Sequence, residues 1–127
     1  MDVNATFALV QAWLTIDPAK ARELVESALD AQEASGRIPR TISPDGSATD
    51  DVPAWPLLAQ SAAEVFRATG DEEFAARVIK PLARHTAWLL RHFAGGNVYA
   101  WTTRDEALIP TTYAERRTTA DLHAILI

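Results

Sequence analysis

Apolar and polar positions in the first part of the chain follow helical spacing in two contrasting patterns. Residues 3–16 are apolar on nearly every side, whereas residues 18–34 carry one apolar stripe opposite a charged face. The first pattern is typical of a buried helix and the second of a helix at the surface. Asp17 and Pro18 predict the boundary between them, because Asp caps helices and Pro fits their first position. Gly36 is expected to end the second helix.

The same two patterns return later in the chain. Residues 55–68 are mostly apolar, and residues 72–93 are amphipathic. The turn between them contains Gly70, which tolerates a left-handed backbone, and Asp71, which can cap the following helix. Pro81 lies inside that helix and should kink or split it.

This alternation predicts an all-α fold in which antiparallel helical hairpins pack in two layers. The apolar helices are expected to form the inner layer and the amphipathic helices the outer layer. After the fourth helix, residues 94–97 are typical of a turn and residues 98–103 have a strand-like composition. Another helix is expected to start near Thr118.

The connection from Ser35 to Pro56 differs from the short turns elsewhere in the pattern. It contains several glycines and prolines, and Trp55 stands close to Pro53 and Pro56. Because it joins an exposed helix to a buried one, it must run over the rim of the helical array. Loops longer than about 12–15 residues are usually functional or disordered, so this one is a candidate for a binding role.

The composition excludes several classes of function. The chain has 127 residues, no cysteine and a net charge of -5, with acidic and basic residues interspersed. A disulfide scaffold and a cysteine-based zinc site are therefore excluded, and the absence of a basic stripe argues against a nucleic-acid partner. No apolar run is long enough to cross a membrane, and the first residues lack the pattern of a signal peptide. These features predict a cytoplasmic protein with one domain and no membrane partner.

Three stretches of the chain resemble a known enzyme group. They are "LDAQEASGRIPRTI", "VPAWPLLAQSAAEVFRATGDEEFAARVIKPLARHTAWLL" and "TTADLHAIL". Together they resemble the six-hairpin, or (α/α)6-toroid, glycoside hydrolases, which include trehalases, processing α-glucosidases and debranching-type glucosidases. The resemblance implies that residues 1–127 form one partial barrel segment, with about two hairpins and the start of a third. It also implies that inner-helix surface is left exposed, so self-association is expected.

The same resemblance implies inverting hydrolysis of an α-glucoside or a related oligosaccharide. Such enzymes use two carboxylates about 6.5–9.5 Å apart, with a water molecule between them. Asp105 and Glu106 are the candidate acids, because they lie in the loop before the helix that begins at Asp121. The "G-W-D-x-S" string of trehalase-like members is missing from that loop, and a solvated loop carboxylate is the alternative role. The partner carboxylate is not found in these residues, so the chain alone is expected to be inactive.

Carbohydrate contacts are expected at the same mouth of the barrel. The resemblance implies that the long loop contributes Arg40, Asp50, Asp51 and Trp55, and that the later loop contributes the pair Trp101 and Arg104. These residue types suit a sugar, which has an apolar face for an aromatic ring and hydroxyls for charged groups. The alternatives are that Trp55 plugs the end of the apolar layer and that Asp50 or Asp51 caps the third helix.

No metal ion or cofactor is expected. His85 and His92 lie two turns apart on one helix, which is too far for one metal ion without a ligand between them, and His123 can cap the last helix. Phosphate-binding loops and nucleophile-elbow strings are also missing. The alternative to an enzyme is a helical-hairpin scaffold that binds a partner protein. The long loop favours the enzyme, because scaffold repeats usually have short loops at both ends.

Overall fold

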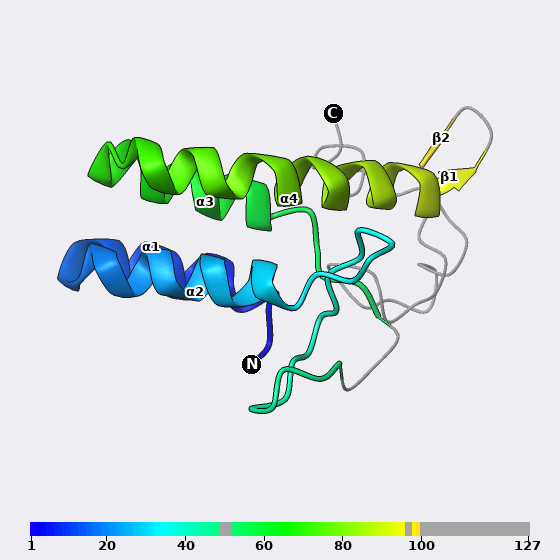
Figure 1. The fold of residues 1–127 in the computed structure, drawn as a ribbon, viewed down its shortest axis with the longest axis horizontal. Coiled ribbons are helices and arrows are strands. Elements are labelled where there is room, and N and C mark those ends of the chain that lie inside the picture. The colour runs from blue at the N-terminus through cyan, green and yellow to red at the C-terminus, as the bar shows by residue number, and fades with distance from the viewer. Residues whose placement is uncertain (49–51, 96–97, 100–127) are drawn as a thin grey trace.

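A computed structural model describes residues 1–48, 52–95 and 98–99 of the chain. Four helices are defined in this part: α1 (Thr6–Ile16), α2 (Pro18–Asp30), α3 (Leu58–Thr69) and α4 (Glu72–His92). They are followed by a small antiparallel pair of strands, β1 (Ala94–Gly95) and β2 (Val98–Tyr99). The predicted all-α fold of antiparallel helical hairpins is confirmed, with short turns at one end and residues 31–48 and 52–57 at the other (Figure 1).

Both short turns are built by aspartate caps, as the sequence predicts. Asp17 precedes α2, and its carboxylate accepts a hydrogen bond from the backbone N–H of Ala19 at 3.0 Å. Asp71 precedes α4, and its carboxylate accepts from the N–H of Phe74 at 2.8 Å. Gly70 ends α3 in the left-handed region, with φ at 65°. These caps satisfy N–H groups that would otherwise lack partners and fix both hairpin turns.

The helices pack in two layers around one apolar core. α1 packs against α2 and α3, while α4 packs against α3 and α2. The core is formed by buried aliphatic and aromatic side chains from all four helices and from the long connection: Val3, Val10, Ala21, Val25, Ala28, Leu29, Ile38, Ile42, Ala54, Leu58, Ala62, Val65, Phe74 and Val78. The long connection is therefore part of the core and is held in place by it.

α1 is less buried than its composition predicts. Val10 is fully buried, but the side chains of Leu9 and Ile16 are 43% and 75% exposed. Within the described residues the main helix contacts of α1 are with α2 and α3, and Leu9 and Ile16 point away from the core. None of the helices in this part of the chain is both long and apolar enough to span a bilayer.

Pro81 does not split the last helix, so that alternative of the sequence prediction is wrong. α4 runs as a single helix from Glu72 to His92 (Figure 1). Phe74 and Val78 before the proline and Leu89 after it are buried on the same face. Burying both halves of one face offsets the roughly 3 kcal/mol that an internal proline costs.

Two helix boundaries also differ from the sequence prediction. α2 ends at Asp30, and Gly36 adopts a positive φ of 96° in a separate turn six residues later. α3 begins at Leu58 rather than at Trp55, with Leu57 in the N-cap position. Asp50 and Asp51, the predicted caps, lie outside the described residues.

Gly36 provides a test of the packing between the long connection and α4. A Cβ atom added there would lie 2.9 Å from the Arg84 carbonyl oxygen, whereas one added at Gly46 would meet nothing within 4 Å. Both glycines have positive φ, so an alanine at either position costs about 1–2 kcal/mol in backbone strain. We expect Gly36→Ala to lower the free energy of unfolding by about 1–3 kcal/mol more than Gly46→Ala in urea denaturation. Equal losses for the two variants would contradict this packing.

Candidate functional site

The start of α1 and the long connection are joined by backbone hydrogen bonds. We call the three paired segments, residues 1–3, 38–42 and 52–54, the rim ladder. The Val3 N–H donates to the Arg40 carbonyl at 2.7 Å, and the Arg40 N–H donates to the Val52 carbonyl at 2.9 Å. The Ala54 N–H donates to the Ile38 carbonyl at 2.8 Å. The central segment is therefore held on both sides, at the end of the molecule where α1 and α3 begin.

Arg40 lies in the middle of the rim ladder. Both its N–H and its carbonyl are used in the pairing, so the position of its Cα is fixed from two directions. Its side chain is half-buried at the end of the helical array. A guanidinium in that position can donate several hydrogen bonds in one plane to hydroxyl or carboxylate oxygens.

Trp55 follows the ladder directly and precedes α3. Its backbone N–H donates to the Oδ1 atom of Asn4 at 2.7 Å, across 51 positions of sequence. The residue is half-buried, while Pro53 and Ala54 before it are buried. Because Pro56 follows, Trp55 is kept out of the helical conformation. A half-buried indole has one part packed and another part accessible, so it suits both roles that the sequence suggests.

A set of polar contacts lies beneath the rim and fixes the turn at Gly36. The Gln32 Nε2 atom donates to the Gly36 carbonyl at 3.0 Å and to the Pro81 carbonyl at 2.8 Å. Arg84 donates to the Gln32 Oε1 atom at 2.5 Å. These bonds tie the long connection to the middle of α4. The bond from Gln32 to Pro81 uses a carbonyl within that helix.

His85 of α4 also contacts the turn at Gly36. It is almost fully buried, with 2% of its surface exposed. Its Nδ1 atom lies 3.3 Å from the Gly36 carbonyl oxygen. Because a carbonyl only accepts, we assign the ring proton to Nδ1. Nε2 is buried and has no hydrogen-bond partner among the described residues. Burial lowers the pKa of the imidazole from 6.5 to about 4, against the opposing effect of the Gly36 and Ala54 backbones.

The adjacent turn is held by a further ion pair. Arg37 donates from Nη2 to the Glu33 Oε1 atom at 2.6 Å and from Nε at 2.9 Å. The guanidinium of Arg37 holds the pKa of Glu33 below its usual range. The Glu33 N–H also donates to the Arg37 carbonyl at 2.9 Å. The turn that leads into the rim ladder is thus fixed by backbone and side-chain contacts together.

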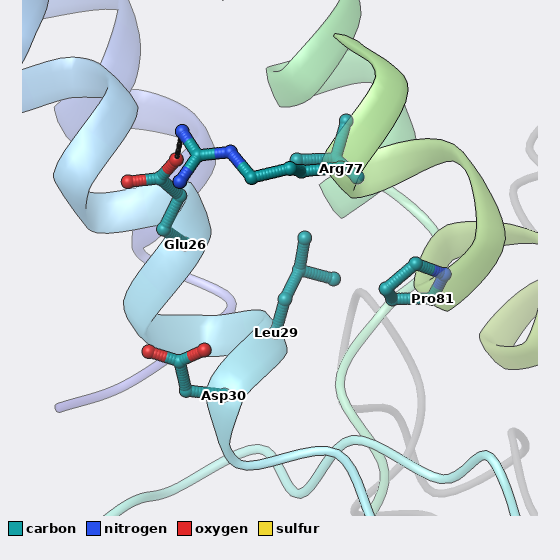
Figure 2. A pocket seen from close by; sticks show the side chains of 6 residues that line it. Glu26, Leu29, Asp30, Arg77 and Pro81 are labelled. Carbon is teal, nitrogen blue, oxygen red and sulfur yellow. Dashed lines mark hydrogen bonds and ion pairs between the residues drawn. The ribbon is translucent and has the colours of Figure 1, made fainter. Parts of the chain in front are cut away.

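A groove of about 200 Å³ lies elsewhere, between α2 and α4 (Figure 2). In Figure 2, Glu26 and Arg77 point toward one another across it, with Arg77 Nη2 at 2.6 Å from Glu26 Oε1. Arg22 also donates to the same oxygen at 3.1 Å. The charged groups are therefore engaged with each other, and the groove shares no lining residue with the rim ladder. It is a seam between two outer helices and is not part of the candidate site.

Residues 4–107 match the family described as the mannosylglycerate hydrolase MGH1-like glycoside hydrolase domain. The matched residues include two segments of the rim ladder, 38–42 and 52–54, the Asn4–Trp55 contact and His85 beneath the rim. The chain belongs to this family. No match was found among the curated proteins or among the solved structures.

Membership of this glycoside hydrolase family bears out the broad resemblance seen in the sequence. It fits a carbohydrate substrate. The family description names neither a trehalase nor a glucosidase, so that finer assignment is not supported by the match.

The structure describes two of the eight candidate site residues, Arg40 and Trp55, and brings their backbones onto adjoining parts of the rim. The other candidates lie outside the described residues: Asp50, Asp51, Trp101, Arg104, Asp105 and Glu106. Within the described part of this domain, acidic and histidine side chains do not gather in groups of three that could hold a metal ion. His92 instead stacks on Trp88, with ring centroids 4.4 Å apart.

The hydrogen bond of Asn4 and the burial of His85 were not predicted from the sequence. Both had a usable signal. Asn4 is a polar residue directly before an apolar helix, which is a position where side chains bond to nearby backbone groups. His85 follows Phe74 and Val78 at helical spacing and precedes Leu89 by four residues, so it lies on the apolar stripe.

The buried imidazole predicts a pH-dependent stability. Between pH 6.5 and about 4 the unfolded chain binds a proton that folded His85 does not, so the free energy of unfolding falls as the pH is lowered. The loss reaches roughly 3 kcal/mol at pH 4. Above pH 6.5 the ring is neutral in both states and contributes no slope.

We expect His85→Gln to remove the part of the pH dependence that comes from this imidazole. The difference in free energy of unfolding between the variant and the parent chain should therefore change between pH 6.5 and 4. Urea denaturation at several pH values measures the difference. His92→Gln is the matched control, because it makes the same change at a half-buried position that stacks on Trp88. A constant difference between His85→Gln and the parent chain across this range would contradict the assignment.

Proposed function

We propose that this domain contributes to an inverting glycoside hydrolase that cleaves an α-glycoside, either an α-glucoside or a compound related to mannosylglycerate. The observation that carries the proposal is the family match across residues 4–107, which spans the long connection and both hairpins. The geometry of the rim supports it, because the end where α1 and α3 begin carries an arginine and a half-buried tryptophan on a fixed backbone.

Arg40 and Trp55 are proposed to bind the sugar at this rim, together with Asp50 and Asp51. A hexose presents an apolar face that can stack on an indole and a ring of hydroxyls that can pair with guanidinium or carboxylate groups. Binding groups are most effective when their positions are fixed before the ligand arrives. The paired backbone on both sides of Arg40 provides this for the segment that carries it.

Asp105 is proposed as the general acid and Glu106 as its neighbour in the same loop. Trp101 and Arg104 are proposed to contact the sugar from this second loop. The family match extends to residue 107 and so includes all four, which supports the assignment of this loop to the glycoside hydrolase domain. The second carboxylate that inverting hydrolysis needs is proposed to come from outside these 127 residues.

The role of Asp105 is tested by Asp105→Asn with Glu106→Gln as the matched control. In a longer polypeptide that contains this domain and hydrolyses mannosylglycerate or an α-glucoside, we expect Asp105→Asn to lower kcat by about 10²–10⁴-fold. Glu106→Gln should lower it far less. Sugar release under saturating substrate measures both. Full activity in Asp105→Asn would contradict the assignment, and turnover by the 127-residue chain alone would contradict its expected inactivity.

The domain is further proposed to be one segment of a larger (α/α)6 toroid. An apolar groove of about 220 Å³ between α3 and α4 supports this proposal. It is lined by small and large apolar residues. Two of them, Phe66 and Ile79, are 41% and 65% exposed. The next hairpin of the toroid is the proposed occupant, because it would bury this surface as α1 and α2 bury the opposite side of α3.

Copies of the 127-residue chain alone are therefore expected to associate through this groove. We expect Ile79→Lys to lower the associated fraction, because it places a charge on the exposed apolar lining. Ala76→Lys adds the same charge at an exposed position of α4 that does not line the groove. Sedimentation equilibrium compares the three chains. An Ile79→Lys chain that associates as strongly as Ala76→Lys would contradict the use of this groove.

A further inference from the structure

Asn4 links the starts of the two inner helices. It lies between the rim ladder and α1, and its Oδ1 atom accepts the hydrogen bond from the Trp55 N–H at 2.7 Å. Its own N–H donates to the Asp2 carboxylate at 2.8 Å. The side chain therefore connects the segment before α1 to the segment before α3, which are more than fifty positions apart in sequence.

The Trp55 N–H has few alternatives for a partner. The residue lies just beyond the ladder, whose last bond joins Ala54 to Ile38, and it lies before α3, which begins at Leu58. Pro56 keeps Trp55 extended. The Asn4 oxygen thus fixes the backbone at the first residue after the ladder, and the backbone direction there sets where the indole is presented.

The other half of the Asn4 amide is unusual. Its Nδ2 atom is buried and has no hydrogen-bond partner among the described residues. A buried donor without a partner costs about 1–3 kcal/mol, so such groups are rare and often have a functional role. The buried Nδ2 atom of Asn4 is destabilising, whereas its Oδ1 atom binds the Trp55 backbone. This combination points to the orientation of Trp55 as the role of Asn4.

We propose that Asn4 is a positioning residue for carbohydrate binding, which holds the Trp55 backbone so that the indole is preset to stack on a hexose ring. This inference rests on the proposed function. Asn4 acts through Trp55 and contributes to affinity by lowering the ordering cost of the aromatic platform before the sugar binds. Loss of the bond should leave the helices folded and weaken only the interactions that depend on the tryptophan.

Two substitutions separate the hydrogen bond from the presence of a side chain. Asn4→Ala removes the acceptor, whereas Asn4→Asp keeps an oxygen at the same distance from the Trp55 N–H. Gln60→Ala is the control, because it removes an exposed amide from the first turn of α3 without touching Trp55. Amide hydrogen exchange of Trp55, followed by NMR, reports the bond directly. Titration with mannosylglycerate, followed by the Trp55 indole signal, reports binding.

We expect Asn4→Ala to raise the Trp55 exchange rate at least tenfold and to weaken mannosylglycerate binding about fivefold or more. Asn4→Asp should restore both, and Gln60→Ala should change neither. Unchanged Trp55 exchange in Asn4→Ala, or unchanged affinity despite faster exchange, would overturn the proposal. If the parent chain fails to bind mannosylglycerate, the proposed function is contradicted for this ligand. The positioning of Trp55 is then still decided by the exchange rates of the variants.

Discussion

The backbone pairing of Arg40 with Val3 on one side and Val52 on the other is the constraint on which the candidate site depends. Helix packing alone would place α1 and α3 side by side but would leave the residues before them without a fixed path. The pairing supplies that path, because it uses N–H and C=O groups that would otherwise remain buried without partners. It also explains why a connection of such length is ordered in its described part, since Ile38 and Ile42 bring it into the apolar core.

A second set of contacts supports the rim from below. The Gly36 carbonyl receives hydrogen bonds from Gln32 and His85, so α4 and the end of α2 hold the same point of the connection. Glycine is required there because the Arg84 carbonyl leaves no room for a side chain. The neutral imidazole is part of this support, and its low pKa follows from the lack of water around it. The outer helix α4 thus holds the long connection in place, and that connection carries Arg40 and Trp55, which are proposed to bind sugar.

Much of this fold could be predicted from hydrophobic periodicity and capping chemistry. The four helices, the Asp17 and Asp71 caps and the left-handed Gly70 follow from local rules that act within a few residues. The predictions that were wrong depend on tertiary contacts. α2 stops at Asp30, and Gln32 and Gly36 beyond it bond to α4 instead of continuing the helix. α4 stays whole through Pro81 because its buried face continues on both sides. The site could be predicted only in part, because the Asn4–Trp55 bond joins residues 51 positions apart and no local pattern encodes that pairing.

The rim ladder, and not the helices alone, fixes the candidate site. Native-state amide hydrogen exchange tests it most directly, because it reports the opening free energy of each N–H group separately. We expect the N–H groups of Val3, Arg40 and Ala54 to exchange slowly and together, with protection comparable to that of Val10 in α1 and Val65 in α3. Exchange of these three amides at the rate of an unstructured loop, while the helices remain protected, would contradict it.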